Sequence, residues 1–202
     1  MARLLGLKKA PVFKEDGDVK VTTEFGKNIK DYPEKGKTGD HNGLDIVRST
    51  DGTSAAATVC AIEDGVVTAQ RKWVKGFRSD SATGGNCVYI KHENGMTSKY
   101  LHLKYGTVPE RIADGVTVKK GEKLGYMGST GYSFGVHLHF QVEDEKGKPV
   151  DPEPYLLGSK SFDKTACPYG LMLTCEFGSK TEAESALALL KKAGISARLC
   201  EI

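Results

Sequence analysis

Histidine is scarce in this chain, yet it is clustered. Four of the five histidines lie in three short groups: His41-Asn-Gly-Leu-Asp45, Tyr100-Leu-His102-Leu and His137-Leu-His139-Phe. Because successive side chains of a strand alternate between its faces, His137 and His139 point to the same side if this segment is extended. The spacing of His41 and Asp45 allows the same, and Gly43 between them leaves room for close approach. Imidazole nitrogens and a carboxylate can therefore converge on one point.

Converging imidazole and carboxylate groups are the usual ligands of a catalytic zinc ion. Such a site takes about three protein ligands and leaves a position for water, whose pKa the ion lowers to roughly 7. Histidines outside the ligand set can move protons or donate hydrogen bonds to a developing oxyanion. Each group alone also has a structural explanation, because a histidine on a strand or beside a carboxylate is often a simple hydrogen-bonding residue. Together, the three groups favour a metal-dependent hydrolase.

The order of the three groups resembles that of the lysostaphin-like zinc endopeptidases, also called the LytM family. The resemblance covers about residues 22–157. It includes the glycine-rich run 128–135 before the last histidine pair, the run Asn86-Cys-Val-Tyr-Ile-Lys-His-Glu-Asn-Gly95, and Val150-Asp-Pro-Glu-Pro-Tyr-Leu156 near its end. The resemblance implies hydrolysis of peptide bonds in bacterial peptidoglycan, and hence cell-wall lysis. Stem or cross-bridge peptides of the wall are the implied substrate.

The resemblance also implies a role for each member of the three groups. His41, Asp45 and His139 are expected to bind one Zn²⁺ per chain. His102 and His137 are the expected catalytic pair, which activates water and stabilises the tetrahedral intermediate. Both sets follow from matching this chain to the family's motifs residue by residue.

Two positions depart from the family pattern without removing a ligand. Val136 stands where proline is common before the His-Leu-His run, and Gln141 stands where a glutamate is common after it. The remaining histidine, His92, matches a position that is usually structural. The departures leave the expected zinc chemistry intact.

Two tyrosines are candidates for contact with the substrate. Tyr100 should lie on the same strand face as His102, although an aromatic residue there is more often part of the packing. Tyr32 belongs to the loop before His41, from which it could reach a groove. We expect both side chains to contact substrate.

Short β-branched and aromatic runs alternate with Gly, Asn and Asp turns from about residue 19 to 156. This pattern predicts a mainly β, antiparallel protein. The clearest hairpin joins residues 87–92 to 96–102, because Asn94-Gly95 supplies the positive φ angles of a tight turn. The polar, basic segment 70–86 is expected to be a long loop beside a groove. The family resemblance implies an antiparallel β-sandwich with a substrate groove, in agreement with this pattern.

A change of pattern near residue 157 predicts the domain organisation. Three prolines within 149–154 end the alternation, so we expect a peptidase domain over residues 1–157 and a linker over 158–164. The pattern of residues 165–202 predicts a small β-α-β module. Because such a unit is marginal alone, we expect it to bind the cell wall or to form a homodimer by strand pairing.

Composition excludes several classes of protein. The net charge of +3 is too small for a nucleic-acid partner, and no apolar run is long enough to cross a membrane. Five cysteines without CxxC spacing are expected to be reduced thiols. The N-terminus lacks the apolar stretch of a secretory signal, so we expect synthesis in a host cytoplasm and action on the wall after release, as for a phage endolysin.

The main alternative is a non-catalytic protein that binds peptidoglycan or activates another hydrolase. Such relatives usually lose metal ligands, and this chain has lost none. A phosphotransfer domain of sugar transport is a second alternative, since such domains use a histidine pair. It is weaker, because such a domain would have no need of Asp45. The glycines of 128–135 do not form a nucleotide site, since no Gly-Lys-Ser/Thr follows and the run leads into a strand.

Overall fold

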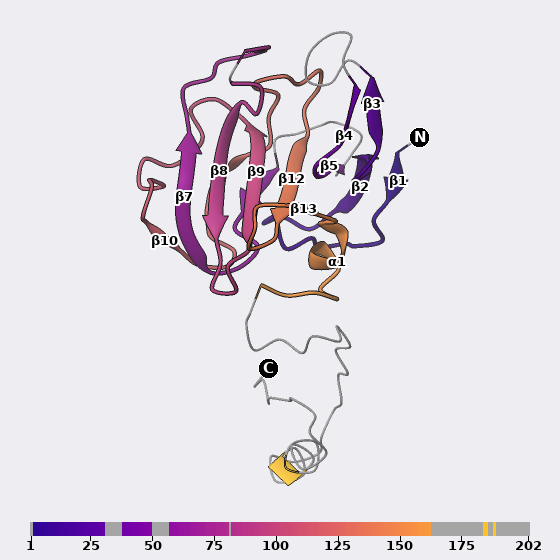
Figure 1. Cartoon of the computed structure of the whole chain (residues 1–202), viewed down its shortest axis with the longest axis vertical. Coiled ribbons are helices and arrows are strands. Elements are labelled where there is room, and N and C mark those ends of the chain that lie inside the picture. The colour runs from indigo at the N-terminus through magenta and orange to yellow at the C-terminus, as the bar shows by residue number, and fades with distance from the viewer. Residues whose placement is uncertain are drawn as a thin grey trace.

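The computed structural model describes residues 2–30, 38–49, 57–80, 82–162, 184–185 and 188. Its main feature is a nine-stranded antiparallel sheet with the order β1-β2-β5-β12-β9-β8-β7-β10, in which β13 pairs with the end of β12 (Figure 1). The strands are β1 (Arg3–Leu4), β2 (Asp18–Thr23), β5 (Leu44–Ser49), β7 (Gly65–Arg71), β8 (Asn86–Lys91), β9 (Thr97–Leu103), β10 (Thr117–Val118), β12 (Leu138–Glu143) and β13 (Pro149–Val150).

Two small sheets and one helical turn complete the described part of the chain. The pairs are β6 (Thr58–Cys60) with β11 (Lys123–Tyr126), and β3 (Asn28–Lys30) with β4 (Thr38–Asp40), while α1 (Glu153–Leu156) follows β13. Val59 of β6 and Leu124 of β11 are fully buried in one core cluster with Ile90 and Phe140 of the large sheet. The small β6–β11 sheet therefore forms the second layer of a sandwich, and the predicted antiparallel β fold is confirmed.

The central strands place their apolar and polar side chains on opposite faces. Leu138, Phe140 and Val142 of β12 are fully buried in the core. On neighbouring β5, Leu44 and Ile46 are also fully buried. Burial of each such side chain contributes about 1.5–3 kcal/mol. The residues between them must then lie on the other face of the sheet.

The predicted hairpin is confirmed. Strands β8 and β9 pair antiparallel, and Gly95 in the turn has φ of 84°. The amide of His92 donates to the carbonyl of Met96 at 2.9 Å, which closes the turn. The expected long loop lies between the end of β7 and the start of β8.

The packed domain continues beyond the predicted boundary at residue 157. Phe162, within the predicted linker, is buried and its ring lies 4.1 Å from that of His92 and 4.7 Å from that of Tyr155. The predicted β-α-β module lies outside the described residues, except for helical positions 184, 185 and 188. Among the described residues, no helix is both long and apolar enough to span a membrane.

Tyr100 has a different place from the one expected. Its side chain is fully buried, and its ring packs 5.4 Å from that of Phe140. The amide of Ile62 donates to its hydroxyl at 2.8 Å, and the hydroxyl of Ser98 lies 3.2 Å away. Tyr100 points into the core from β9 and cannot touch a substrate, so the expected contact was wrong.

This placement predicts that Tyr100→Phe lowers the free energy of unfolding by about 1–3 kcal/mol, because the buried amide of Ile62 loses its acceptor. Tyr105→Phe is the matched control, since Tyr105 is 46% exposed and should leave stability unchanged. Urea denaturation of the two variants measures the difference. Equal stability of Tyr100→Phe and the parent would contradict the assigned role.

Candidate metal centre

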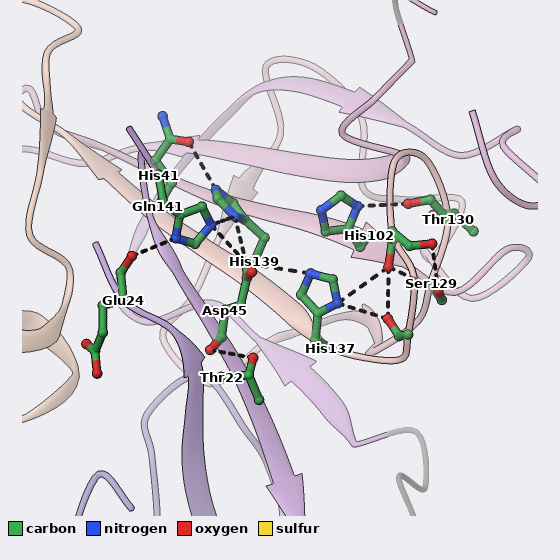
Figure 2. A network of polar contacts seen from close by, with 12 residues as sticks. Thr22, Glu24, His41, Asp45, His102, Ser129, Thr130, His137, His139 and Gln141 are labelled. Carbon is green, nitrogen blue, oxygen red and sulfur yellow. Dashed lines mark hydrogen bonds and ion pairs between the residues drawn. The ribbon is translucent and has the colours of Figure 1, made fainter. Parts of the chain in front are cut away.

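The pairing of β5 with β12 brings two of the expected ligands together. His139 is the register partner of Asp45, so both side chains leave the same face of the sheet side by side. Gly43 is needed here, because a Cβ at this position would lie 2.7 Å from Nε2 of His139 and 2.6 Å from the carbonyl oxygen of Phe140. His41 follows β4 and turns its ring over the same point (Figure 2).

Three side-chain atoms of these residues form a nearly equilateral triangle. Nε2 of His41 lies 2.9 Å from Nδ1 of His139 and 3.1 Å from Oδ1 of Asp45. Nδ1 of His139 lies 3.0 Å from the same Oδ1. Ligand atoms of a tetrahedral zinc with bonds of about 2.0–2.1 Å lie about 3.3 Å apart. The triangle is therefore close to the size of one face of a zinc tetrahedron.

The outer nitrogens of both imidazoles determine where the lone pairs point. Nδ1 of His41 donates to the backbone carbonyl of Glu24 at 3.0 Å, which leaves Nε2 unprotonated in the neutral ring. Nε2 of His139 lies 3.3 Å from Oε1 of Gln141, which leaves Nδ1 for the triangle. Two nitrogen lone pairs and one carboxylate then face a single point, which is a donor set that fits zinc.

Asp45 contributes the negative charge of this donor set. An aspartate carboxylate is ionised at neutral pH, as a metal ligand must be.

The two remaining histidines of the motifs face the same point from the side (Figure 2). Nδ1 of His102 donates to the carbonyl of Thr130 at 2.8 Å, and Nδ1 of His137 donates to the carbonyl of Gly135 at 2.9 Å. The two rings lie 4.8 Å apart, and Nε2 of His137 is 3.5 Å from Oδ1 of Asp45. Each ring thus directs Nε2 towards the site.

His102 reaches this position through an unusual backbone conformation. In a regular strand it would follow Ser98 and Tyr100 into the core, but its φ of 63° turns the ring into the groove. Among the described residues it is the single non-glycine residue with positive φ. Burial, with smaller effects from the charges of His137 and His139, lowers the pKa of His102 to about 3. The ring is therefore neutral at pH 7, with the lone pair of Nε2 available to accept a hydrogen bond.

The site opens into a groove of about 450 Å³. Tyr132 and Phe134 line one wall, and both rings pack on Phe77, at 5.3 and 5.5 Å. Sequence reasoning missed this wall, although the aromatic residues within the glycine-rich run 128–135 were a usable signal. Tyr32, the other expected substrate contact, lies outside the described residues.

His92 is not part of this groove lining. Its Nδ1 donates to the carbonyl of Asp64 and its Nε2 contacts the hydroxyl of Ser98, both at 2.8 Å. Burial lowers its pKa, so the ring is neutral. Both nitrogens are satisfied inside the fold, as expected for a structural histidine.

The model of peptidase family M23 matches residues 39–152, which is more than half of the chain and includes all five histidines. The chain belongs to peptidase family M23. It is 35% identical over 112 residues to the DD-carboxypeptidase/endopeptidase Mpg of Neisseria meningitidis, covering 55% of this chain and 22% of that protein. It is 33% identical over 131 residues to the peptidoglycan DD-endopeptidase ShyB of Vibrio cholerae, covering 65% and 26%.

A solved structure supports the same fold. The catalytic domain of the antimicrobial peptidase lysostaphin from Staphylococcus simulans matches with a TM-score of 0.50 and 26% identity, over 67% of this chain and 90% of that domain. The expected family resemblance is confirmed. The chain spans about a quarter of the length of the two curated M23 relatives named above.

The triangle of ligand atoms predicts which substitutions remove a metal. His139→Ala should abolish stoichiometric zinc binding, because it removes one of three ligands, whereas His137→Ala should retain it. The pair is matched, since the same change is made two positions apart on the same segment. Atomic absorption after dialysis measures the zinc content. A His139→Ala protein that keeps one zinc per chain would contradict the assigned ligand set.

Proposed function

We propose that this chain is a zinc-dependent endopeptidase that hydrolyses peptide bonds of bacterial peptidoglycan. The observation that carries the proposal is the convergence of the ligand triangle with Nε2 of both His102 and His137 at the floor of one open groove. Relatives whose names describe peptidoglycan endopeptidases support the substrate class. Wall peptides of the stem or cross-bridge are thus the proposed substrate.

The residues divide the chemistry between them. A zinc ion held by His41, Asp45 and His139 would polarise the scissile carbonyl and acidify water. His102, neutral and with a free Nε2, accepts the proton of the attacking water. His137 can donate from Nε2 in its protonated form, and this nitrogen lies 3.5 Å from the carboxylate of Asp45. In that form it provides the hydrogen bond for the oxyanion, and His102 passes the proton taken from water to the leaving amine.

The alternative of a non-catalytic wall-binding or activator protein has less support. A binding protein needs neither a complete ligand set nor two further histidines aimed at it. Here the three expected ligands and the two further histidines all line one groove. Each imidazole is oriented by a hydrogen bond from the ring nitrogen that faces away from the site. Preorganised groups of this kind are typical of catalysis.

Narrower expectations from the sequence accompany this proposal. These are the role of a phage endolysin, action on the wall after release from a host cytoplasm, and wall binding or homodimer formation through residues 165–202. Light scattering of the full chain and of a chain ending after Phe162 tests the homodimer. A homodimer through residues 165–202 predicts the mass of a dimer for the full chain and the mass of a monomer for the shorter chain. A full chain with the mass of a monomer would contradict it.

The experiment on function is turbidity loss of a purified wall suspension, with and without a chelator. We expect lysis that a chelator stops and that added zinc restores. His102→Ala and His137→Ala should each lower the rate about 10²–10⁴-fold while zinc content stays at one per chain, because a proton-transfer group is lost. Zinc-loaded parent protein that releases no peptide fragments would contradict the proposal.

The aromatic wall predicts an effect on substrate binding. Phe134 is 84% exposed, so Phe134→Ala should leave stability unchanged and raise KM about 5–20-fold through lost contact area. Tyr105→Ala, an exposed aromatic residue outside the groove lining, is the control and should leave KM unchanged. Steady-state kinetics on soluble wall fragments measures both. Equal KM values for the two variants would show that the aromatic side of the groove does not contact substrate.

A further inference from the structure

A row of polar side chains leads away from the metal ligand His139 along the outer face of β12. Because side chains alternate along the strand, Gln141 and Glu143 lie on the same face as His139. Oε1 of Gln141 lies 3.3 Å from Nε2 of His139, and the amide nitrogen of Gln141 donates to Oε1 of Glu143 at 2.8 Å. Gln141 is only 8% exposed, and its side chain reaches the His139 ring in Figure 2.

A lysine from the neighbouring strand anchors the far end of this row. Nζ of Lys99 on β9 donates to the same Oε1 of Glu143 at 2.5 Å, and it lies 4.7 Å from the ring centroid of Tyr89. The Lys99 and Glu143 side chains are only 18% and 16% exposed. Their pairing is therefore shielded from solvent more than a surface ion pair, and it fixes the carboxylate in place.

The chemistry of these groups determines the direction of every hydrogen bond in the row. The carboxylate of Glu143 can only accept, so the NH₂ end of the Gln141 amide must face it. The oxygen end then faces His139, and because it too can only accept, Nε2 of His139 must carry the proton. Nδ1 of His139 is left with its lone pair, at 2.9 Å from Nε2 of His41 and 3.0 Å from Oδ1 of Asp45.

We propose that Gln141 is a positioning residue that sets the tautomer and ring orientation of His139, and that Lys99 and Glu143 orient its amide. The inference rests on the proposed zinc site and extends it beyond the ligands. It also explains why an amide stands at 141: a glutamate there would place a second carboxylate about 2.8 Å from that of Glu143. In this chain the negative charge lies at Glu143, two residues farther along β12 from the ligand His139.

The test measures zinc affinity by chelator competition. Gln141→Leu should raise the zinc dissociation constant about 10–100-fold, the usual loss for an outer partner of a ligand histidine. Glu143→Gln should raise it less, because the amide of Gln141 remains but loses its fixed orientation. Glu145→Gln makes the same chemical change at an exposed position beyond the row and should leave affinity unchanged. The Gln141→Glu variant should bind zinc more weakly than the parent, because two carboxylates then lie side by side. The double variant Gln141→Glu with Glu143→Gln should recover most of the zinc affinity.

A second readout needs neither metal nor activity. Nitrogen-15 NMR of the zinc-free protein should find the His139 proton on Nε2 in the parent and in Glu145→Gln, and a mixture of tautomers in Gln141→Leu. Unchanged zinc affinity and tautomer in Gln141→Leu would overturn the proposal. Parent protein that binds no zinc would instead count against the proposed function, while the NMR comparison would still decide the role of Gln141.

Discussion

The register between β5 and β12 is the constraint on which the site depends. Slipping a strand by one residue moves every side chain to the other face. Leu44 and Ile46 on β5 and Leu138 and Phe140 on β12 are fully buried, so a slip would expose them and cost several kcal/mol. The core therefore fixes the register, and the register places His139 beside the ligand carboxylate. The stability of the fold and the geometry of the metal site have the same origin.

The loops supply what the sheet cannot. The segments around residues 76–78 and 131 are joined by backbone hydrogen bonds, from Arg78 to the carbonyl of Gly131 and from Gly131 to that of Gly76. Gly131 has φ of 80°, and a Cβ there would lie 2.2 Å from the amide nitrogen of Gly85. This close contact holds the glycine-rich run beside His102, whose ring it orients through the carbonyl of Thr130. One wall of the groove and one catalytic histidine are thus positioned together.

Much of this arrangement follows from the sequence, and the exceptions have physical reasons. The alternation of β12 and the turn at Gly95 are local patterns, so the sheet, the hairpin and the shared face of His137 and His139 could be predicted. Tyr100 was misplaced because simple alternation ties it to His102, whereas the positive φ of His102 separates the two. That backbone angle depends on tertiary contacts with the loops. The row that orients Gln141 was equally invisible, because its far end at Glu143 is held by Lys99 from β9, and local patterns do not show contacts between strands.

A zinc-loaded crystal structure of the full chain tests the assigned ligand set most directly. We expect one ion bound by Nε2 of His41, Nδ1 of His139 and a carboxylate oxygen of Asp45, at about 2.0–2.2 Å. Nε2 of His102 and of His137 should face the open coordination position without binding the ion. Zinc bound elsewhere, or bound by His102 or His137 in place of His139, would contradict the central claim.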